Sequence, residues 1–164
     1  MPKHLLRPQG EFPAAGLARR LAAIFYDFLL SVALLLVIAF AYKLALMGLY
    51  GEAQLRQWTD AGALDGDPLL STLLLLGLFG FFAKFWTHSG QTLGMQVWNI
   101  RVQNVDGSAI SLLQALLRFL VAMASWLCLG LGFLWSLWDK DKRSWHDIYS
   151  DSRVVQLPKN IHKK

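Results

Sequence analysis

The chain has 164 residues, enough for one domain, and 55% of them are hydrophobic while only 16% are charged. Soluble domains carry about 25% charged residues, so this composition leaves too little polar surface to coat a water-soluble globule and predicts an integral membrane protein. The net charge of +5 does not indicate nucleic-acid binding, because the basic residues are scattered at the edges of apolar segments. Basic residues in such places favour contact with anionic membrane lipids.

The first predicted element is a transmembrane helix. Residues 1–14 contain three prolines, so we expect a cytoplasmic tail that leads into a helix near Ala14. Within Leu21–Ala41 the only carboxylate is Asp27. About 20 residues that rise 1.5 Å each cross the roughly 30 Å hydrocarbon layer of a membrane. We therefore predict a first span that continues toward Gly48.

A second span is predicted after a polar loop. Residues 48–68 are rich in glycine and acidic residues. They end on Asp67-Pro68, which matches a helix N-cap followed by proline at the first helical position. The segment Leu69–Thr87 is almost wholly apolar, and the long side chain of Lys84 near its end can reach the membrane surface. These features predict a second transmembrane helix.

The rest of the chain combines strand-like segments with a third apolar segment. Residues 97–110 begin with the alternation typical of a half-buried strand and contain an Asp-Gly turn, and residues 152–157 form a second strand-like segment. Between them, Ser111 is a suitable N-cap, and residues 112–138 carry a single charge, Arg118. We expect a third helical segment and a small cytoplasmic β element.

Two topologies fit this third segment. Lys and Arg favour the cytoplasmic side of a membrane. The N-terminal tail has four of them, residues 89–118 have two and residues 139–164 have seven, whereas residues 42–68 have two beside four acidic residues. A single crossing by residues 112–138 would put the basic C-terminal part outside. A bend at Cys128–Gly132 would make the segment re-entrant and keep both strands on one side, which the expected strand pairing favours.

Asp27 requires a partner, because an ionised aspartate at the centre of a span costs about 2.5–3.5 kcal/mol. We expect its carboxylate to face the bundle and to contact Lys84 or Arg20, with Arg19 and Arg118 as further charge partners. Such a group is either a proton or cation site or a structural ion pair that fixes helix packing, and the residues alone leave both interpretations open.

Several short motifs follow one another in a specific order. They are Arg19-Arg20-Leu21-Ala22-Ala23, Gly90-Gln91-Thr92-Leu93-Gly94, Ile100-Arg101-Val102, Asp106-Gly107, Ala115-Leu116-Leu117-Arg118-Phe119, Gly130-Leu131-Gly132-Phe133-Leu134-Trp135 and Trp145-His146-Asp147. Together they resemble the RDD family of bacterial membrane proteins over about residues 16–155. The resemblance implies an inner-membrane location and, loosely, a part in transport, with cation/proton antiport suggested for some members, but no established activity.

The family is named after one arginine and two aspartates. The resemblance implies that these are Arg20, or its neighbour Arg19, together with Asp27 and Asp147. The chain departs from the family pattern at Met95, where a lysine commonly follows the Gly-Gln-Thr-Leu-Gly motif, so any role of that lysine is missing here.

The residues around Asp147 also allow predictions of their own. His146 and Asp147 could be metal ligands or an acid–base pair, but neighbouring residues on a helix or strand point in different directions and no second such cluster lies at ligand spacing. We therefore expect Asp147 to cap a helix end or to pair with a basic residue such as Arg101 or Arg118.

The sequence as a whole predicts an all-α membrane protein: a small helical bundle of two full transmembrane helices plus a third spanning or re-entrant helical segment, with a small cytoplasmic β element. We expect a cytoplasmic tail at 1–14, an RDD-like transmembrane domain at 15–158 and a basic C-terminal tail at 159–164. The protein would be multi-pass in the bacterial inner membrane, with its N-terminus in the cytoplasm.

Two functions are predicted. The first is transport or cation/proton exchange, in which Asp27, with Arg20 and Lys84, handles a monovalent cation or proton. Because three helices enclose little volume, this requires a homo-oligomer or a partner membrane protein. The alternative is a non-transporting scaffold or assembly factor that binds membrane lipids or a partner protein. We recognise no catalytic set, cofactor motif or metal cluster in the sequence and do not expect an enzyme.

Overall fold

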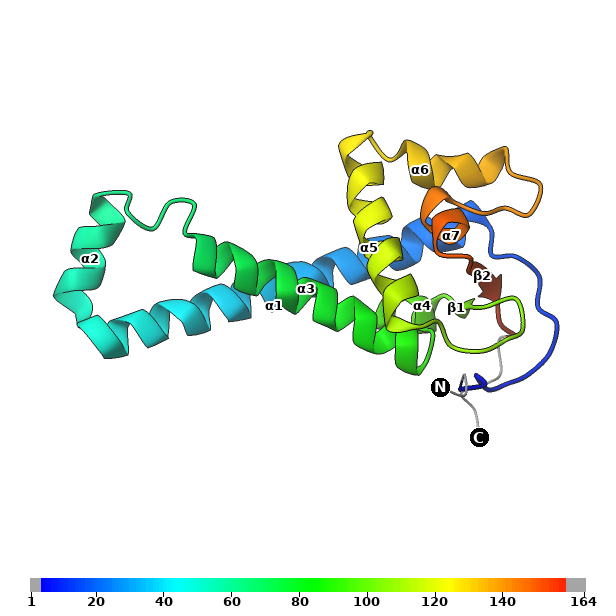
Figure 1. Ribbon diagram of the computed structural model, residues 1–164, viewed down its shortest axis with the longest axis horizontal. Coiled ribbons are helices and arrows are strands. Elements are labelled where there is room, and N and C mark those ends of the chain that lie inside the picture. Colours follow the sequence, from blue (N-terminus) through cyan, green and yellow to red (C-terminus); the bar gives the residue numbers. More distant parts are fainter. Residues whose placement is uncertain (1–3, 159–164) are drawn as a thin grey trace. The chain divides into compact units, whose positions relative to one another are not determined.

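The computed structural model describes residues 4–158, so the basic tail predicted at 159–164 lies outside the described residues. The protein is mostly helical and forms two compact units, unit 1 (the chain up to Phe28 and from Phe81) and unit 2 (Leu29–Gly80). The elements, all labelled in Figure 1 except η1, follow in this order: α1 (Leu17–Tyr50), α2 (Glu52–Asp60), α3 (Pro68–His88), α4 (Leu93–Val97), β1 (Ile100–Gln103), α5 (Leu112–Leu127), α6 (Leu131–Leu134), the 3-10 helix η1 (Trp135–Leu137), α7 (Trp145–Tyr149) and β2 (Arg153–Gln156).

Two helices, α1 and α3, are long and apolar enough to cross a membrane. They coincide with the two predicted spans, although α1 extends over 34 residues and so exceeds the predicted segment at both ends. The predicted start of the second span is also confirmed, since the Asp67 carboxylate accepts the backbone N–H of Leu69 at 2.8 Å. In unit 2, Gly77 of α3 lies against the side chain of Ile38 of α1.

The polar loop predicted at 48–68 is wrong in part, because nine of its residues form helix α2. Glu52 and Arg56 stand four residues apart on this helix and form an exposed ion pair. Such a pair stabilises a short polar helix by a few tenths of a kcal/mol. The glycines that suggested a loop lie outside α2, whereas Glu52 and Asp60 are its first and last residues.

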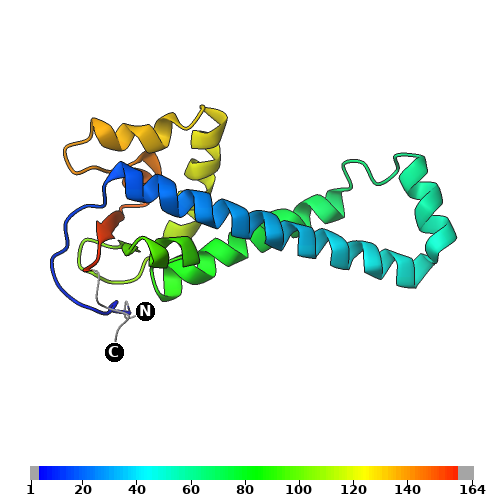
Figure 2. The same ribbon diagram turned by 180° about the vertical axis from the view of Figure 1, so that it is seen from behind.

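The predicted pairing of the two strands in unit 1 is confirmed. Strands β1 and β2 are antiparallel, with Arg101 opposite Val155. The first strand begins three residues later than predicted, because the segment before it forms the short helix α4, capped by Thr92. The N-terminal segment also runs beside this sheet (Figure 2), where Ala14 pairs with Val155 and the Arg101 guanidinium donates to the carbonyl of Pro8 at 3.1 Å.

The third apolar segment is bent, as one of the two predicted topologies requires. Helix α5 is preceded by its N-cap Ser111, whose side chain accepts the backbone N–H of Gln114 while the Gln114 side chain accepts the Ser111 N–H. The chain turns by 110° between α5 and the α6–η1 segment. The break lies at residues 128–130, where Gly130 adopts a left-handed φ of 79°, a conformation that suits glycine.

The exposed face of α5 is apolar, while its buried face contains polar side chains. Arg118 and Ser125 are buried, whereas the large hydrophobic side chains on the outside are exposed: Leu112, Leu113, Leu116, Leu117, Leu120, Met123, Trp126 and Leu127. A helix on the surface of a soluble protein has the opposite arrangement. This face is therefore suited to contact with lipid.

Candidate functional site

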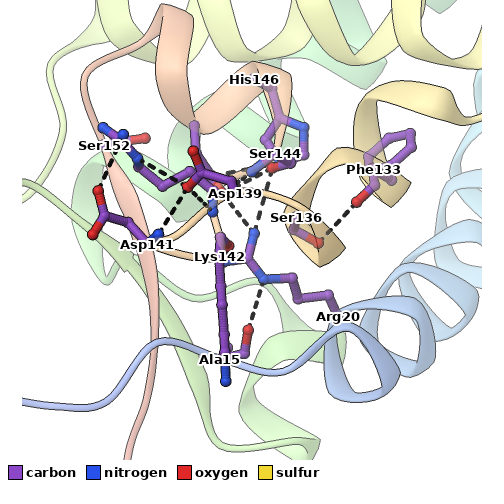
Figure 3. A network of polar contacts seen from close by, with 12 residues as sticks. Ala15, Arg20, Phe133, Ser136, Asp139, Asp141, Lys142, Ser144, His146 and Ser152 are labelled. Atoms are coloured by element: carbon purple, nitrogen blue, oxygen red, sulfur yellow. Dashed lines mark hydrogen bonds and ion pairs between the residues drawn. The ribbon is translucent and has the colours of Figure 1, made fainter.

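Two buried arginines share one buried aspartate at the centre of unit 1. Oδ2 of Asp147 accepts a hydrogen bond from Nη1 of Arg20 at 2.5 Å, and Oδ1 of Asp147 accepts one from Nη1 of Arg118 at 2.6 Å. The Arg20 guanidinium also donates to the carbonyls of Ala15, at 3.0 Å, and Lys142, at 2.8 Å (Figure 3). We call Arg20, Arg118 and Asp147 the arginine–aspartate cluster.

Local structure places Asp147 between the two arginines. It is the third residue of α7, and its Oδ2 accepts both the backbone N–H and the hydroxyl of Ser144, which precedes the helix. On α5, Arg118 has its guanidinium 5.3 Å from the centre of the Trp86 ring and donates to the hydroxyl of Ser152 at 2.6 Å. Both predicted roles of Asp147 are thus combined, since it occupies a helix start and pairs with Arg118.

The charges of the cluster determine the protonation of Asp147. Burial by itself raises the pKa of this carboxyl, but the guanidiniums of Arg118 and Arg20 outweigh burial and hold the pKa well below its usual value. Asp147 is therefore ionised at neutral pH, and it carries one negative charge against two positive ones. Breaking a buried pair of this kind is costly, since the remaining charge stays out of water.

The cluster is suited to holding segments together. It links the start of α1, the middle of α5, the start of α7 and the Lys142 carbonyl in the preceding loop. Both Asp147 oxygens are occupied by donors from the chain itself. Side chains with these partners are more suited to a fixed structural contact than to the transfer of a proton or cation.

Asp27 lies elsewhere in unit 1 and has neutral partners. Its Oδ2 accepts the hydroxyl of Thr92, and its Oδ1 accepts the backbone N–H of Gly94 at 2.9 Å. The side chain is buried, since Asp27 is 5% exposed. Thr92 also accepts the N–H of Met95 as the cap of α4, so a single threonine orders this short helix and donates to Asp27. The Asp27 carboxylate therefore fixes α4 against α1.

The predicted ion pair of Asp27 with Lys84 or Arg20 is wrong. Over residues 4–158, no basic nitrogen lies within 4.0 Å of the Asp27 carboxylate. Lys84 is exposed on α3, and Arg20 is directed to Asp147 instead. The physical reason is that a hydroxyl and a peptide N–H already satisfy the carboxylate. Arg19 also lies outside the cluster, with Nη1 3.3 Å from the carbonyl of Trp98.

Several residues of these two sites were not singled out from the sequence. Thr92 and Gly94 enter the sequence analysis only as members of the Gly-Gln-Thr-Leu-Gly motif, although a threonine before a short apolar stretch is a recognisable N-cap. Ser144, three residues before Asp147, fits a capping pattern in the same way. Ser152 accepts a hydrogen bond from Arg118, and no local sequence pattern indicates this contact.

Because His146 is a titratable residue packed next to the cluster, the stability of the protein at different pH values tests this packing. Its ring is buried, 5.1 Å from the Phe133 ring, with Nε2 2.9 Å from the Ser144 hydroxyl. Burial lowers the pKa of His146 to about 3, despite the attraction of Asp147. Because the unfolded chain binds a proton near pH 6.5 and the folded protein does not, the free energy of unfolding should fall as the pH decreases from 6.5, by up to about 1.4 kcal/mol per pH unit.

Thermal unfolding of the purified protein in detergent, measured between pH 7 and pH 5, checks this prediction. His146→Gln should make the unfolding temperature less dependent on pH in this range. His88→Gln serves as the matched control, because it makes the same substitution at an exposed position at the end of α3. An unchanged pH dependence in His146→Gln would contradict the assignment.

Comparisons with known proteins agree with the resemblance noted in the sequence. A model of the RDD family matches residues 14–151, a range that contains Arg20, Asp27 and Asp147. An uncharacterized protein of Bacillus subtilis (strain 168), YckC, is 31% identical over 103 residues, which is 60% of this chain and 67% of YckC. No solved structure is significantly similar. The chain therefore belongs to the RDD family.

Proposed function

We propose that this protein is a non-transporting membrane scaffold, which two transmembrane helices anchor in the bacterial inner membrane and which binds lipid or a partner protein. One observation carries the proposal: the two aspartates of the family motif have both carboxylate oxygens bonded to donors of the same chain. An aspartate that carries ions must exchange its partners during each cycle, whereas these partners form part of the packing between helices. The motif residues are then structural contacts that keep unit 1 folded.

Ion-flux measurements test this proposal. In proteoliposomes that hold a pH gradient, we expect additions of Na⁺, Li⁺ or K⁺ to move no more protons than in empty vesicles. Cation-dependent proton movement that disappears in Asp27→Asn, while the matched control Asp60→Asn retains it, would overturn the scaffold proposal. Asp60 is suitable as the control because it is an exposed acidic residue at the end of α2.

One observation favours the alternative, cation/proton exchange. Asp27 is a buried carboxylate within α1, and no basic group of the described chain lies within 4.0 Å to balance it. Acidic residues inside membrane spans often mark proton or ion pathways. The flux measurement with Asp27→Asn therefore decides between the two functions.

For the orientation, we propose that the N-terminus and unit 1 face the cytoplasm and that residues 51–67 lie on the other side. Support comes from the basic residues near the N-terminus and after residue 139, according to the positive-inside rule. The pairing of β1 with β2 also keeps their two segments on one side of the membrane. This arrangement makes the bent third segment re-entrant, since it begins and ends on that side.

Cysteine labelling tests the orientation. In a Cys128→Ala background, single cysteines replace the exposed residues Asp60 and Tyr149. In intact cells, a membrane-impermeant maleimide should label the cysteine at position 60 but not the one at position 149. The cysteine at position 149 should be labelled only after the cells are lysed. Labelling of position 149 in intact cells would contradict the proposed orientation.

A further inference from the structure

An open pocket of about 540 Å³ lies within unit 1, beside the start of α1. It is lined by Ala18 and Arg19 of α1 and by Val97, Trp98 and Asn99 at the end of α4. These residues belong neither to the arginine–aspartate cluster nor to the contacts of Asp27. A basic residue and an aromatic residue thus face a surface pocket that the structural role of the family motif does not explain.

The backbone that forms one wall of the pocket is well fixed. The Trp98 N–H donates to the carbonyl of Gly94 at 3.3 Å, and the Asn99 carbonyl accepts the N–H of Leu157 at 2.7 Å. Asn99 has a left-handed φ of 52°, which asparagine adopts more readily than most residues. The wall is therefore preformed, so a ligand would not have to order it.

The arginine of the pocket has unused N–H donors. The Arg19 guanidinium makes one long hydrogen bond, 3.3 Å to the carbonyl of Trp98, and no carboxylate of residues 4–158 lies within 4.0 Å of it. The lining includes no acidic residue. A net positive charge with free donors favours an anion.

Arg19 differs from Arg20, the next residue along the helix, in how its guanidinium is bonded. Arg20 uses all three guanidinium nitrogens on Asp147, Ala15 and Lys142 of the same chain. Arg19 is also an arginine at the start of α1, but its guanidinium lacks such partners. Of the two neighbouring arginines, one is therefore occupied by the fold and the other is available to a ligand.

We propose that this pocket binds the phosphate of an anionic phospholipid headgroup, an inference that deepens and rests on the proposed scaffold function. Arginine pairs with phosphate through two parallel N–H bonds, and the apolar side chains of Ala18, Val97 and Trp98 suit the glycerol and upper acyl region. Val97 is 56% exposed. Arg19 precedes the apolar part of α1, where a span meets the headgroup layer, and tryptophan is enriched at that depth.

Native mass spectrometry of the full chain in detergent, titrated with phosphatidylglycerol, tests the proposal. The wild type should retain phosphatidylglycerol better than phosphatidylcholine. Arg19→Gln should retain phosphatidylglycerol about five- to tenfold more weakly, as expected for the loss of one charge at the membrane surface. The matched control Arg56→Gln should bind like the wild type, because Arg56 is exposed on α2 and paired with Glu52.

A second variant and a competitor complete the test. Trp98→Leu keeps an apolar side chain in the wall of the pocket but removes the aromatic ring, and it should also weaken retention, because tryptophan suits the depth of the headgroup layer. Millimolar inorganic phosphate should not displace the lipid; displacement would assign the pocket to a soluble phosphate compound and overturn the lipid proposal. Equal retention by Arg19→Gln and wild type would overturn it as well. These outcomes are independent of the ion-flux result, so a failure here is distinguishable from a failure of the scaffold function.

Discussion

Asp147→Asn is expected to lower the free energy of unfolding of the protein by about 3–5 kcal/mol, the cost of breaking a buried ion pair from one side. The substitution keeps the shape of the side chain but leaves the guanidiniums of Arg20 and Arg118 buried without a counter-charge. The resistance of the purified protein to heat and to limited proteolysis in detergent measures this loss. The loss of stability should be evident as unfolding at a lower temperature or as failure of the protein to accumulate in the membrane.

Two controls show whether the charge itself is responsible. Glu52→Gln removes an acid from an exposed ion pair with Arg56 and should change stability by less than about 1 kcal/mol. Adding Arg118→Met to Asp147→Asn removes one of the uncompensated charges, so the double variant should be more stable than Asp147→Asn alone. A double variant that is less stable than Asp147→Asn would contradict the electrostatic explanation.

Gly94→Ala is expected to destabilise unit 1 by about 1–3 kcal/mol, the range for overpacking a tight contact. A methyl group at this position would meet the backbone carbonyl of Ala23 and lie 2.8 Å from Oδ1 of Asp27. The helices would have to separate, which would also lengthen the hydrogen bond from the Gly94 N–H to Asp27. The unfolding temperature in detergent measures the effect.

Gly16→Ala is the matched control, because no atom lies within 4 Å of the Cβ that it would add next to the start of α1. It should leave the unfolding temperature almost unchanged. If Gly94→Ala were as stable as Gly16→Ala, the close approach of α4 to α1 and the role of Asp27 in it would both be wrong.

Several parts of the fold could be predicted from the sequence because they depend on local interactions. The two spans follow from long apolar segments, and the start of α3 follows from the Asp67-Pro68 pair. The bend between α5 and α6 follows from Gly130 and Gly132, which interrupt an apolar segment. In each case the preference lies within a few neighbouring residues or in their partition between water and lipid. The short helices α2 and α4 were missed, because so few residues give little periodic signal.

The composition and motifs of the sequence by themselves determined that this chain is a membrane protein of the RDD family with a buried aspartate in its first span. Only the tertiary structure decided which groups the two aspartates contact. Asp27 bonds to Thr92, 65 positions away, and Arg20 to Asp147, 127 positions away. Charge and helical spacing indicated basic partners for Asp27, but hydrogen bonds between distant segments depend on how the helices dock. That docking gave Asp27 neutral donors and left Arg19 without a carboxylate within 4.0 Å among residues 4–158.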